Sequence, residues 1–126
     1  MADYYYTKTH EWIAKIDGQW RVGITNYAQE QLGDITFVEI AEPGSSFKQG
    51  DALGTIESIK SVSEIYAPVD LTIAEKNQAT EDDPAIINQD PQGEGYLFVA
   101  SEVNQDQLSG LMDEAAYQEF LSQQEA

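Results

Sequence analysis

The chain has 126 residues, with 23 acidic and six basic side chains and a formal charge of −17 at pH 7. Its length fits one domain, and an apolar fraction of 41% suffices for a buried core. The negative charge excludes nucleic acid as a partner, because phosphate contacts need Lys and Arg. The lack of cysteine excludes disulfides and thiolate chemistry within the chain.

The first part of the chain predicts a hairpin, a helix and a strand. Apolar residues alternate over 10–24 on both sides of a turn signal, which indicates a β-hairpin. Asn26 and Gln29 have the spacing of a capping box, so we expect a short helix that ends at Gly33. The β-branched and aromatic residues of 35–40 predict a strand.

The middle of the chain predicts short strands between turns. Gly54 indicates a bulge or a close approach of two backbones. The segment 77–95 is rich in turn residues, and one helical turn is expected over Pro84–Asn88. The expected strands are 52–59, 62–66, 69–75 and 96–100.

The C-terminal part has helix signals. Asn104 and Gln107 form a second capping box, and Asp113 is expected to cap a last helix. On that helix an apolar face is formed by Tyr117, Phe120 and Leu121. The pattern predicts a mainly β fold, a small sandwich or barrel with appended helices. We expect a single domain over 1–126, with its core at about 20–100 and a helical segment at about 104–123.

Targeting signals are not apparent. No apolar run approaches the ~18 residues of a membrane span. The segment Met1–Tyr6 has the character of neither a signal peptide nor a transit peptide. We therefore expect a cytoplasmic protein that does not bind membranes.

Most candidate groups for chemistry have a simpler interpretation. His10 is the only histidine, so a transition-metal site is not expected and a structural role is favoured. Asp82-Asp83 lacks the spacing of a calcium loop and is expected to face solvent. Twin carboxylates for glycoside chemistry are not ruled out by counting, but nothing singles out a pair.

Lys60 is the exception. It lies between two predicted strands, where a two-residue Lys60-Ser61 turn framed by Ile59 and Val62 would expose its ammonium. An amine held in this way suits an enzyme that acylates it, which removes the charge and adds a chemical group.

Four segments resemble the glycine cleavage system H protein family, the lipoyl carriers of that complex. Together they indicate a resemblance from about Tyr4 to Leu121. The segments are HEWI (His10 to Ile13), GITNYAQEQLGDITFVEI (Gly23 to Ile40), PGSSFKQGDALGTIESIKSVSEIYAP (Pro43 to Pro68) and DPQGEGYL (Asp90 to Leu97).

The resemblance favours lipoate over biotin on Lys60. Biotin carriers usually flank their lysine with methionines, whereas this chain has Ile59 and Ser61. It implies a barrel-sandwich hybrid fold, as in lipoyl and biotinyl carriers, with lipoic acid joined to Lys60 by an amide.

The resemblance also implies the partners. Glycine decarboxylase (P protein) would load the aminomethyl group of glycine onto the carrier, and a tetrahydrofolate-dependent aminomethyltransferase (T protein) would accept the one-carbon unit. Dihydrolipoamide dehydrogenase (L protein) would reoxidise the dithiol, and lipoate-attaching enzymes would modify Lys60. The protein would then be a carrier subunit and not an enzyme, with no catalytic residue of its own.

The family further implies a cleft for the loaded arm, for which the matching residues here are Glu11, Gln31 and Glu64. Asp70-Leu71 departs from the small residue and Gly that are common in the family, and Leu does not readily take a positive φ. This departure leaves room for the first of two alternatives, and the second stands apart from it. One is an H-like paralogue that relays lipoate to other lipoyl domains, and the other is an enzyme that uses acidic residues alone.

Overall fold

The computed structural model describes residues 3–125, whose regular structure is mostly short β-strand. The strands are β1 (Tyr4–Tyr6), β2 (Glu11–Ile16), β3 (Gln19–Ile24), β4 (Ile35–Ile40), β5 (Ser46–Phe47), β6 (Ala52–Ser58), β7 (Val62–Tyr66), β8 (Leu71–Lys76) and β9 (Phe98–Ser101). The helices are α1 (Asn26–Leu32), α2 (Gln78–Asp82), α3 (Ala85–Gln89), the 3-10 helix η1 (Gln105–Gly110) and α4 (Glu114–Glu125). The predicted mainly β fold with short helices and a helical C-terminal segment is confirmed.

Three elements were not expected from the sequence: β1, β5 and α2. Their few residues span less than two repeats of the strand or helix period, so their pattern is too weak to predict them. The remaining predicted elements are present, with ends that differ by one or two residues.

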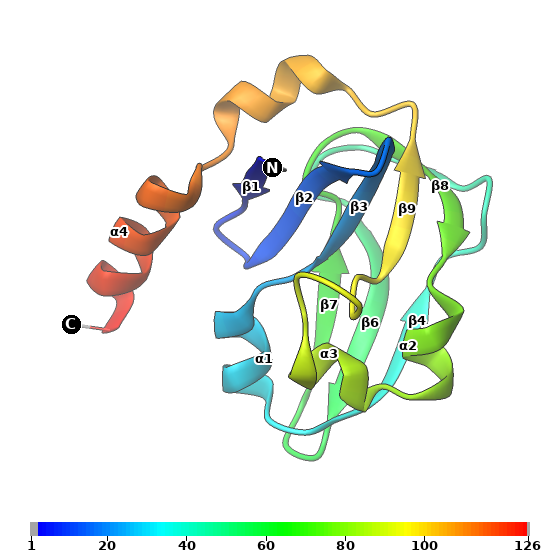
Figure 1. The fold of residues 1–126 in the computed structure, drawn as a ribbon, viewed down its shortest axis with the longest axis vertical. Helices are drawn as coiled ribbons and strands as arrows, with labels where there is room; N and C mark the ends of the chain where they lie inside the picture. Colours follow the sequence, from blue (N-terminus) through cyan, green and yellow to red (C-terminus); the bar gives the residue numbers. More distant parts are fainter. Residues whose placement is uncertain (1–2, 126) are drawn as a thin grey trace.

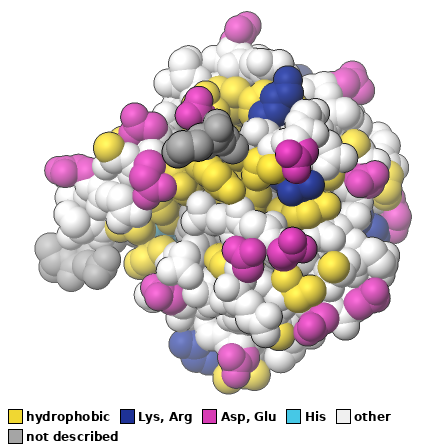
Figure 2. Space-filling model, in the orientation of Figure 1, with side chains coloured by type: hydrophobic (Ala, Val, Ile, Leu, Met, Phe, Trp, Pro, Cys, Tyr) yellow, Lys and Arg dark blue, Asp and Glu magenta, His cyan; other side chains and the backbone are white. Residues whose placement is uncertain are grey.

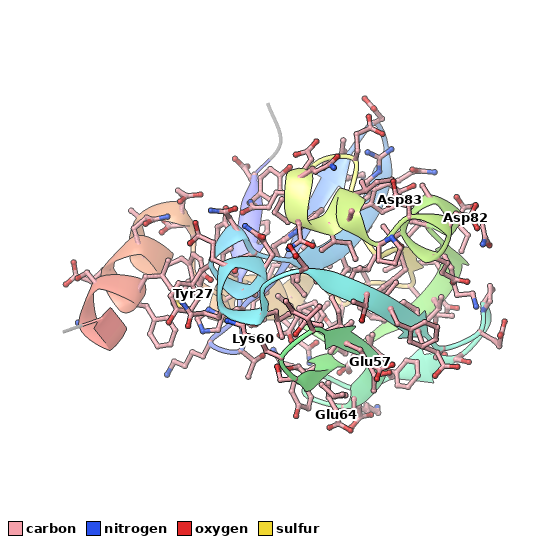
Figure 3. The ribbon with its side chains drawn as sticks, turned by 90° about the horizontal axis from the view of Figure 1, so that it is seen from below. Tyr27, Glu57, Lys60, Glu64, Asp82 and Asp83 are labelled. Atoms are coloured by element: carbon pink, nitrogen blue, oxygen red, sulfur yellow. The ribbon has the colours of Figure 1, made fainter. Side chains whose placement is uncertain are left out.

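The strands form two antiparallel sheets. One has the order β1-β2-β3-β9-β8-β5 and the other the order β4-β6-β7. Figures 1 and 3 show the sheets as two layers, with α1 and α3 at the end where the β6–β7 hairpin turns. The two packed layers agree with the predicted barrel-sandwich hybrid.

One apolar cluster fills the space between the layers. Ile13 and Val22 reach it from the larger sheet, and Val38, Ile56 and Ile65 reach it from the smaller one. In β4 the buried Val38 stands between the exposed Phe37 and Glu39, which is the alternation expected of a strand with one solvated face. The outer face of this part of the smaller sheet is thus exposed to solvent.

The helix α1 begins one residue earlier than predicted. Thr25 is its N-cap, because the Thr25 hydroxyl accepts a hydrogen bond from the backbone N–H of Ala28 at 3.2 Å. Asn26 is the first helical residue, and its side chain accepts a hydrogen bond from Gln29. The predicted Asn26–Gln29 capping box is therefore wrong, and a tertiary contact of Thr25 with Tyr117 favours the observed choice. The predicted end at Gly33, which has a φ of 79°, is confirmed.

Gly54 lies where the backbones of β4 and β6 approach each other closely. A Cβ at Gly54 would lie 2.5 Å from the carbonyl oxygen of Glu39. The pairing of β6 with β7 also shifts its register between Ala52 and Gly54. Both predictions for Gly54, a bulge and a close approach, are confirmed.

Asp70-Leu71, the pair that departs from the family pattern, lies at the start of β8 and connects this strand to the C-terminal segment. Leu71 pairs with Phe47 as a strand residue and is not among the described residues with positive φ. Asp70 donates its backbone N–H to the side chain of Gln107 at 2.6 Å and accepts from the N–H of Gln49 through its carboxylate. Asn104 caps η1 as predicted, but Gln107 does not complete the capping box, because its side chain bonds Asp70 instead.

A second apolar cluster attaches α4 to the edge of the larger sheet, beside β1 (Figure 1). Asp113 accepts a hydrogen bond from Ala116 N–H, so the predicted cap is confirmed. The predicted apolar face is also confirmed, since Tyr117 and Leu121 are buried and Phe120 packs against them. The C-terminal helix is therefore part of the packed structure and not a loose appendage.

Acidic side chains predominate over basic ones on the face shown in Figure 2. Asp82 and Asp83 are exposed, as predicted, and Figure 3 shows them on the side of the molecule away from Lys60. Across residues 3–125, no helix combines the length and the apolar character needed to cross a bilayer.

Candidate functional site

Lys60 lies at the tip of the β6–β7 hairpin (Figure 3). The turn is closed by a hydrogen bond from Ser58 N–H to Ser61 O at 2.8 Å, so Ile59 and Lys60 are its central residues. The predicted Lys60-Ser61 turn is therefore wrong by one residue. The hydroxyl of Ser58 accepts from the N–H groups of Lys60 and Ser61, at 3.2 and 3.1 Å. This local capping shifts the turn and fixes the backbone that carries the lysine.

The Lys60 side chain is exposed, as predicted, but its stem is supported by the end of α1. A Cβ built on Gly33 would lie 3.1 Å from Cε of Lys60 and 3.8 Å from Nζ. The stem thus passes over the glycine that ends α1. An exposed amine on a supported stem can be reached by a modifying enzyme, which is what acylation of Lys60 requires.

Large hydrophobic side chains surround this tip. Among the described residues, three large hydrophobic side chains are exposed to solvent. They are Phe37, Ile59 and Val62, with 48%, 69% and 63% of their surface exposed. Phe37 and Val62 both pair with Glu57 across the sheet, so the three lie in a row on its outer face. The lysine is consequently presented beside an apolar surface with an acidic residue in it.

A cavity of about 170 Å³ lies between α1, β7 and the start of β2. It is lined by all three residues that the resemblance pointed to, Glu11, Gln31 and Glu64. Gln31 lies on α1, two residues before the capping Gly33, and Glu64 lies on β7, four residues beyond Lys60. The structure thus brings the three residues together next to the segments that hold the lysine.

Glu11 is the buried acid of this cavity, with 2% of its surface exposed. Its carboxylate accepts hydrogen bonds from the hydroxyls of Thr7, at 2.7 Å, and Thr9, and from Tyr66 N–H at 3.2 Å. Burial raises the pKa of Glu11 above its ordinary value, against the opposing effect of these donors. Glu11 therefore supplies a polar group whose charge is costly to keep inside the protein.

Gln31 and Glu64 form the outer rim of the cavity, where Gln31 is exposed and Glu64 lies on β7. Glu64 accepts a hydrogen bond from the Tyr66 hydroxyl at 3.3 Å and raises the pKa of that phenol by its negative charge. Two acidic groups and an amide thus lie among mainly apolar lining residues, and within the described part of the chain neither Lys nor Arg lines this cavity. Such a lining favours a small cationic group.

Sequence reasoning missed other lining residues, among them Thr9, Tyr27 and Ser63. Thr9 could have been noticed as a hydroxyl two residues before Glu11, but only the fold brings Tyr27 and Ser63 to the same wall. His10 also lines the cavity, and its Nδ1 lies 2.7 Å from the Tyr117 hydroxyl. These contacts agree with the structural interpretation of His10.

Within residues 3–125, His, Asp and Glu do not gather in a group of three or more able to hold a metal ion. The site therefore offers one exposed amine, one apolar surface and one small acidic cavity. This combination suits the attachment and sheltering of a covalently held group.

Comparisons with known proteins agree on one family. The family model described as Glycine cleavage H-protein matches residues 4–124. A glycine cleavage system H protein of Thermotoga maritima is 46% identical over 94% of this chain and 96% of its own length. One from Bartonella quintana is 43% identical over 96% of this chain and 99% of its own. A crystal structure of a glycine cleavage system H protein from Mycobacterium marinum superposes with a TM-score of 0.82 at 38% identity and covers 98% of both chains.

Proposed function

The chain belongs to the glycine cleavage H-protein family, and on that basis we propose that it carries lipoic acid as an amide on Lys60. The observation that supports this most directly is the position of Lys60, an exposed amine at the tip of a capped hairpin turn. Its ammonium has no ion pair with any described residue, so acylation breaks no salt bridge. The residues present therefore fit the group.

We propose that the protein carries the aminomethyl group of glycine from the pyridoxal-phosphate decarboxylase to the tetrahydrofolate-dependent aminomethyltransferase. Dihydrolipoamide dehydrogenase then reoxidises the dithiol of the carrier. The bound lipoyl group supplies the sulfur chemistry that the cysteine-free chain lacks. Lys60 provides the attachment point, and the chain acts as a carrier subunit in the cytoplasm.

Glu11, Gln31 and Glu64 are proposed to hold the loaded end of the arm. An aminomethyl group carries a basic amine, which matches the acidic lining of the 170 Å³ cavity. Glu64 on the rim would attract the amine, while Gln31 would orient it by hydrogen bonding. The small size of the cavity would exclude most water and thus protect a labile group.

The exposed surface around Lys60 supports docking to the partner enzymes. Ile59 lies within the lysine turn and Val62 follows it, and an acidic chain attracts partners with basic docking surfaces. The alternative duty, relay of lipoate to other lipoyl domains, was suggested by Asp70-Leu71. Asp70 bonds Gln49 and Gln107, and neither Asp70 nor Leu71 lines the acidic cavity, so this departure does not favour the alternative.

Mass analysis of the protein from its own cells tests the proposal. Trypsin would cleave after Lys48, Lys60 and Lys76, but an amide on Lys60 blocks the middle cleavage. We expect one peptide over 49–76 that carries a lipoyl increment. The Lys60→Arg protein from the same cells should instead yield 49–60 and 61–76 without an increment. An unmodified Lys60 in the native protein would overturn the proposal.

A further inference from the structure

The Lys60 turn rests on the connection between α1 and β4. The backbone N–H of Ile59 donates a hydrogen bond to the carbonyl oxygen of Asp34 at 3.0 Å. The Lys60 stem passes over Gly33, as its Cε shows. Figure 1 shows that the backbone of the α1–β4 connection runs beside the tip of the β6–β7 hairpin. The position of the lysine therefore depends on how firmly residues 33–35 are held.

A single side chain from α3 holds this connection. The Asn88 amide nitrogen donates to Gly33 O at 2.9 Å and to Gln29 Oε1 at 3.0 Å. Its carbonyl oxygen accepts from the backbone N–H of Ile35 at 2.9 Å. One donor hydrogen and the acceptor of Asn88 thus bind the two sides of Asp34, and the second donor hydrogen binds the Gln29 side chain on α1. An asparagine is well suited to this task because a carboxylate lacks the donors and a methyl lacks both kinds of group.

We propose that Asn88 is a positioning residue for the lysine turn, acting through the 33–35 connection on Ile59 and Lys60. The same bonds fix the C-terminal end of α1, whose Gln31 and Leu32 line the acidic cavity. The Asn88 side chain, 28 positions downstream of Lys60, thereby keeps Lys60 in a fixed position relative to the cavity. The functional part of this inference rests on the proposed lipoylation of Lys60.

Loosening of the lysine turn would have a quantitative effect on the enzyme that modifies Lys60. If the turn loosens, only a fraction of the molecules presents the lysine correctly, and the apparent affinity falls in proportion to that fraction. The chemical step in the correctly bound fraction is unchanged. Loss of Asn88 should therefore raise KM and leave kcat nearly constant.

Hydrogen exchange on the unmodified protein tests the structural part. In Asn88→Ala we expect the Ile59 amide to exchange about five to ten times faster, as for the loss of one hydrogen bond. The Ile73 amide, which bonds Ser45 O elsewhere in the fold, should be unaffected. Gln89→Ala is the matched control, since Gln89 is the exposed neighbour on the same helix. Equal acceleration at Ile59 and Ile73, or none at Ile59, would overturn the proposal.

Lipoylation kinetics test the functional part. With a purified lipoate-attaching enzyme and unmodified protein, Asn88→Ala should raise KM about fivefold at constant kcat, and Gln89→Ala should change neither. Asn88→Asp keeps the acceptor for Ile35 N–H but would place a carboxylate oxygen against Gly33 O, so it should raise KM at least as much as alanine does and gives a second test of the same contact. An unchanged KM with faster Ile59 exchange would reject the functional role. Failure of lipoylation at Lys60 in the unsubstituted protein would instead reject the proposed function and leave the exchange result intact.

Discussion

The hydroxyl of Tyr117 in α4 lies 2.7 Å from Nδ1 of His10, although the two residues are 107 positions apart. The same hydroxyl lies 2.7 Å from the Thr25 hydroxyl, which caps α1. The C-terminal helix is thereby joined to two elements that line the acidic cavity. The Tyr117 ring also stacks on Tyr6, with ring centroids 4.5 Å apart.

Tyr117→Phe removes the shared hydroxyl and retains the ring. We expect a loss of about 1–2 kcal/mol in the free energy of unfolding, because the buried Thr25 hydroxyl and the half-buried His10 ring each lose a partner. Urea unfolding followed by fluorescence measures this loss. Tyr5→Phe is a suitable control, since its hydroxyl has no hydrogen bond with the described residues. Equal effects of the two substitutions would contradict the assigned role of the Tyr117 hydroxyl.

Glu11 should make stability depend on pH in a specific direction. Its pKa is raised in the folded protein, so the folded state holds the proton more tightly than the unfolded state does. The resulting stabilisation is fully present below the ordinary value of 4.5 and is lost as the pH rises through the folded pKa. As the pH rises from 4 to 7, the free energy of unfolding of the unsubstituted protein should therefore fall relative to that of Glu11→Gln. Urea unfolding at the two pH values measures this difference. A difference that is independent of pH, or that changes in the opposite direction, would be evidence against burial as the dominant cause.

Gly54→Ala should be destabilising because the new methyl would lie 2.5 Å from Glu39 O, a backbone atom. We expect a cost of about 1–3 kcal/mol, measured as a lower midpoint of urea unfolding. Gly110→Ala is the matched control, since a Cβ there meets nothing within 4 Å. If both variants unfold at the same midpoint, the close approach of β4 and β6 is not a constraint on the fold.

Lys60→Arg should abolish glycine decarboxylation in an assay with the purified partner enzymes. Arginine keeps the charge, but its guanidinium does not provide the amine needed for the lipoyl amide. The side chain is exposed, so the free energy of unfolding should change by less than about 0.5 kcal/mol. Persistent glycine decarboxylation by a well-folded Lys60→Arg protein would show that another residue carries the group.

The local sequence determined most of the strands and the position of the lysine. Alternation of apolar residues predicted the first hairpin, and Gly33 and Gly54 predicted a helix end and a close approach, because these signals act over a few residues. Lys60 was identified in the same way, from its place between two strands. The exact turn was missed because the Ser58 hydroxyl competes for the backbone N–H groups of Lys60 and Ser61.

Only the tertiary structure decided how distant groups meet. Thr25, and not Asn26, caps the helix, and its hydroxyl also forms a hydrogen bond with Tyr117, far along the chain. The cavity required Glu11, Gln31 and Glu64 to be brought together by three different elements. Asn88 could not be linked to Lys60 from sequence, since its hydrogen bonds act on residues more than fifty positions earlier and reach the lysine turn only through the folded connection at 33–35. Short-range pattern thus specified the carrier lysine, and long-range contacts specified the site around it.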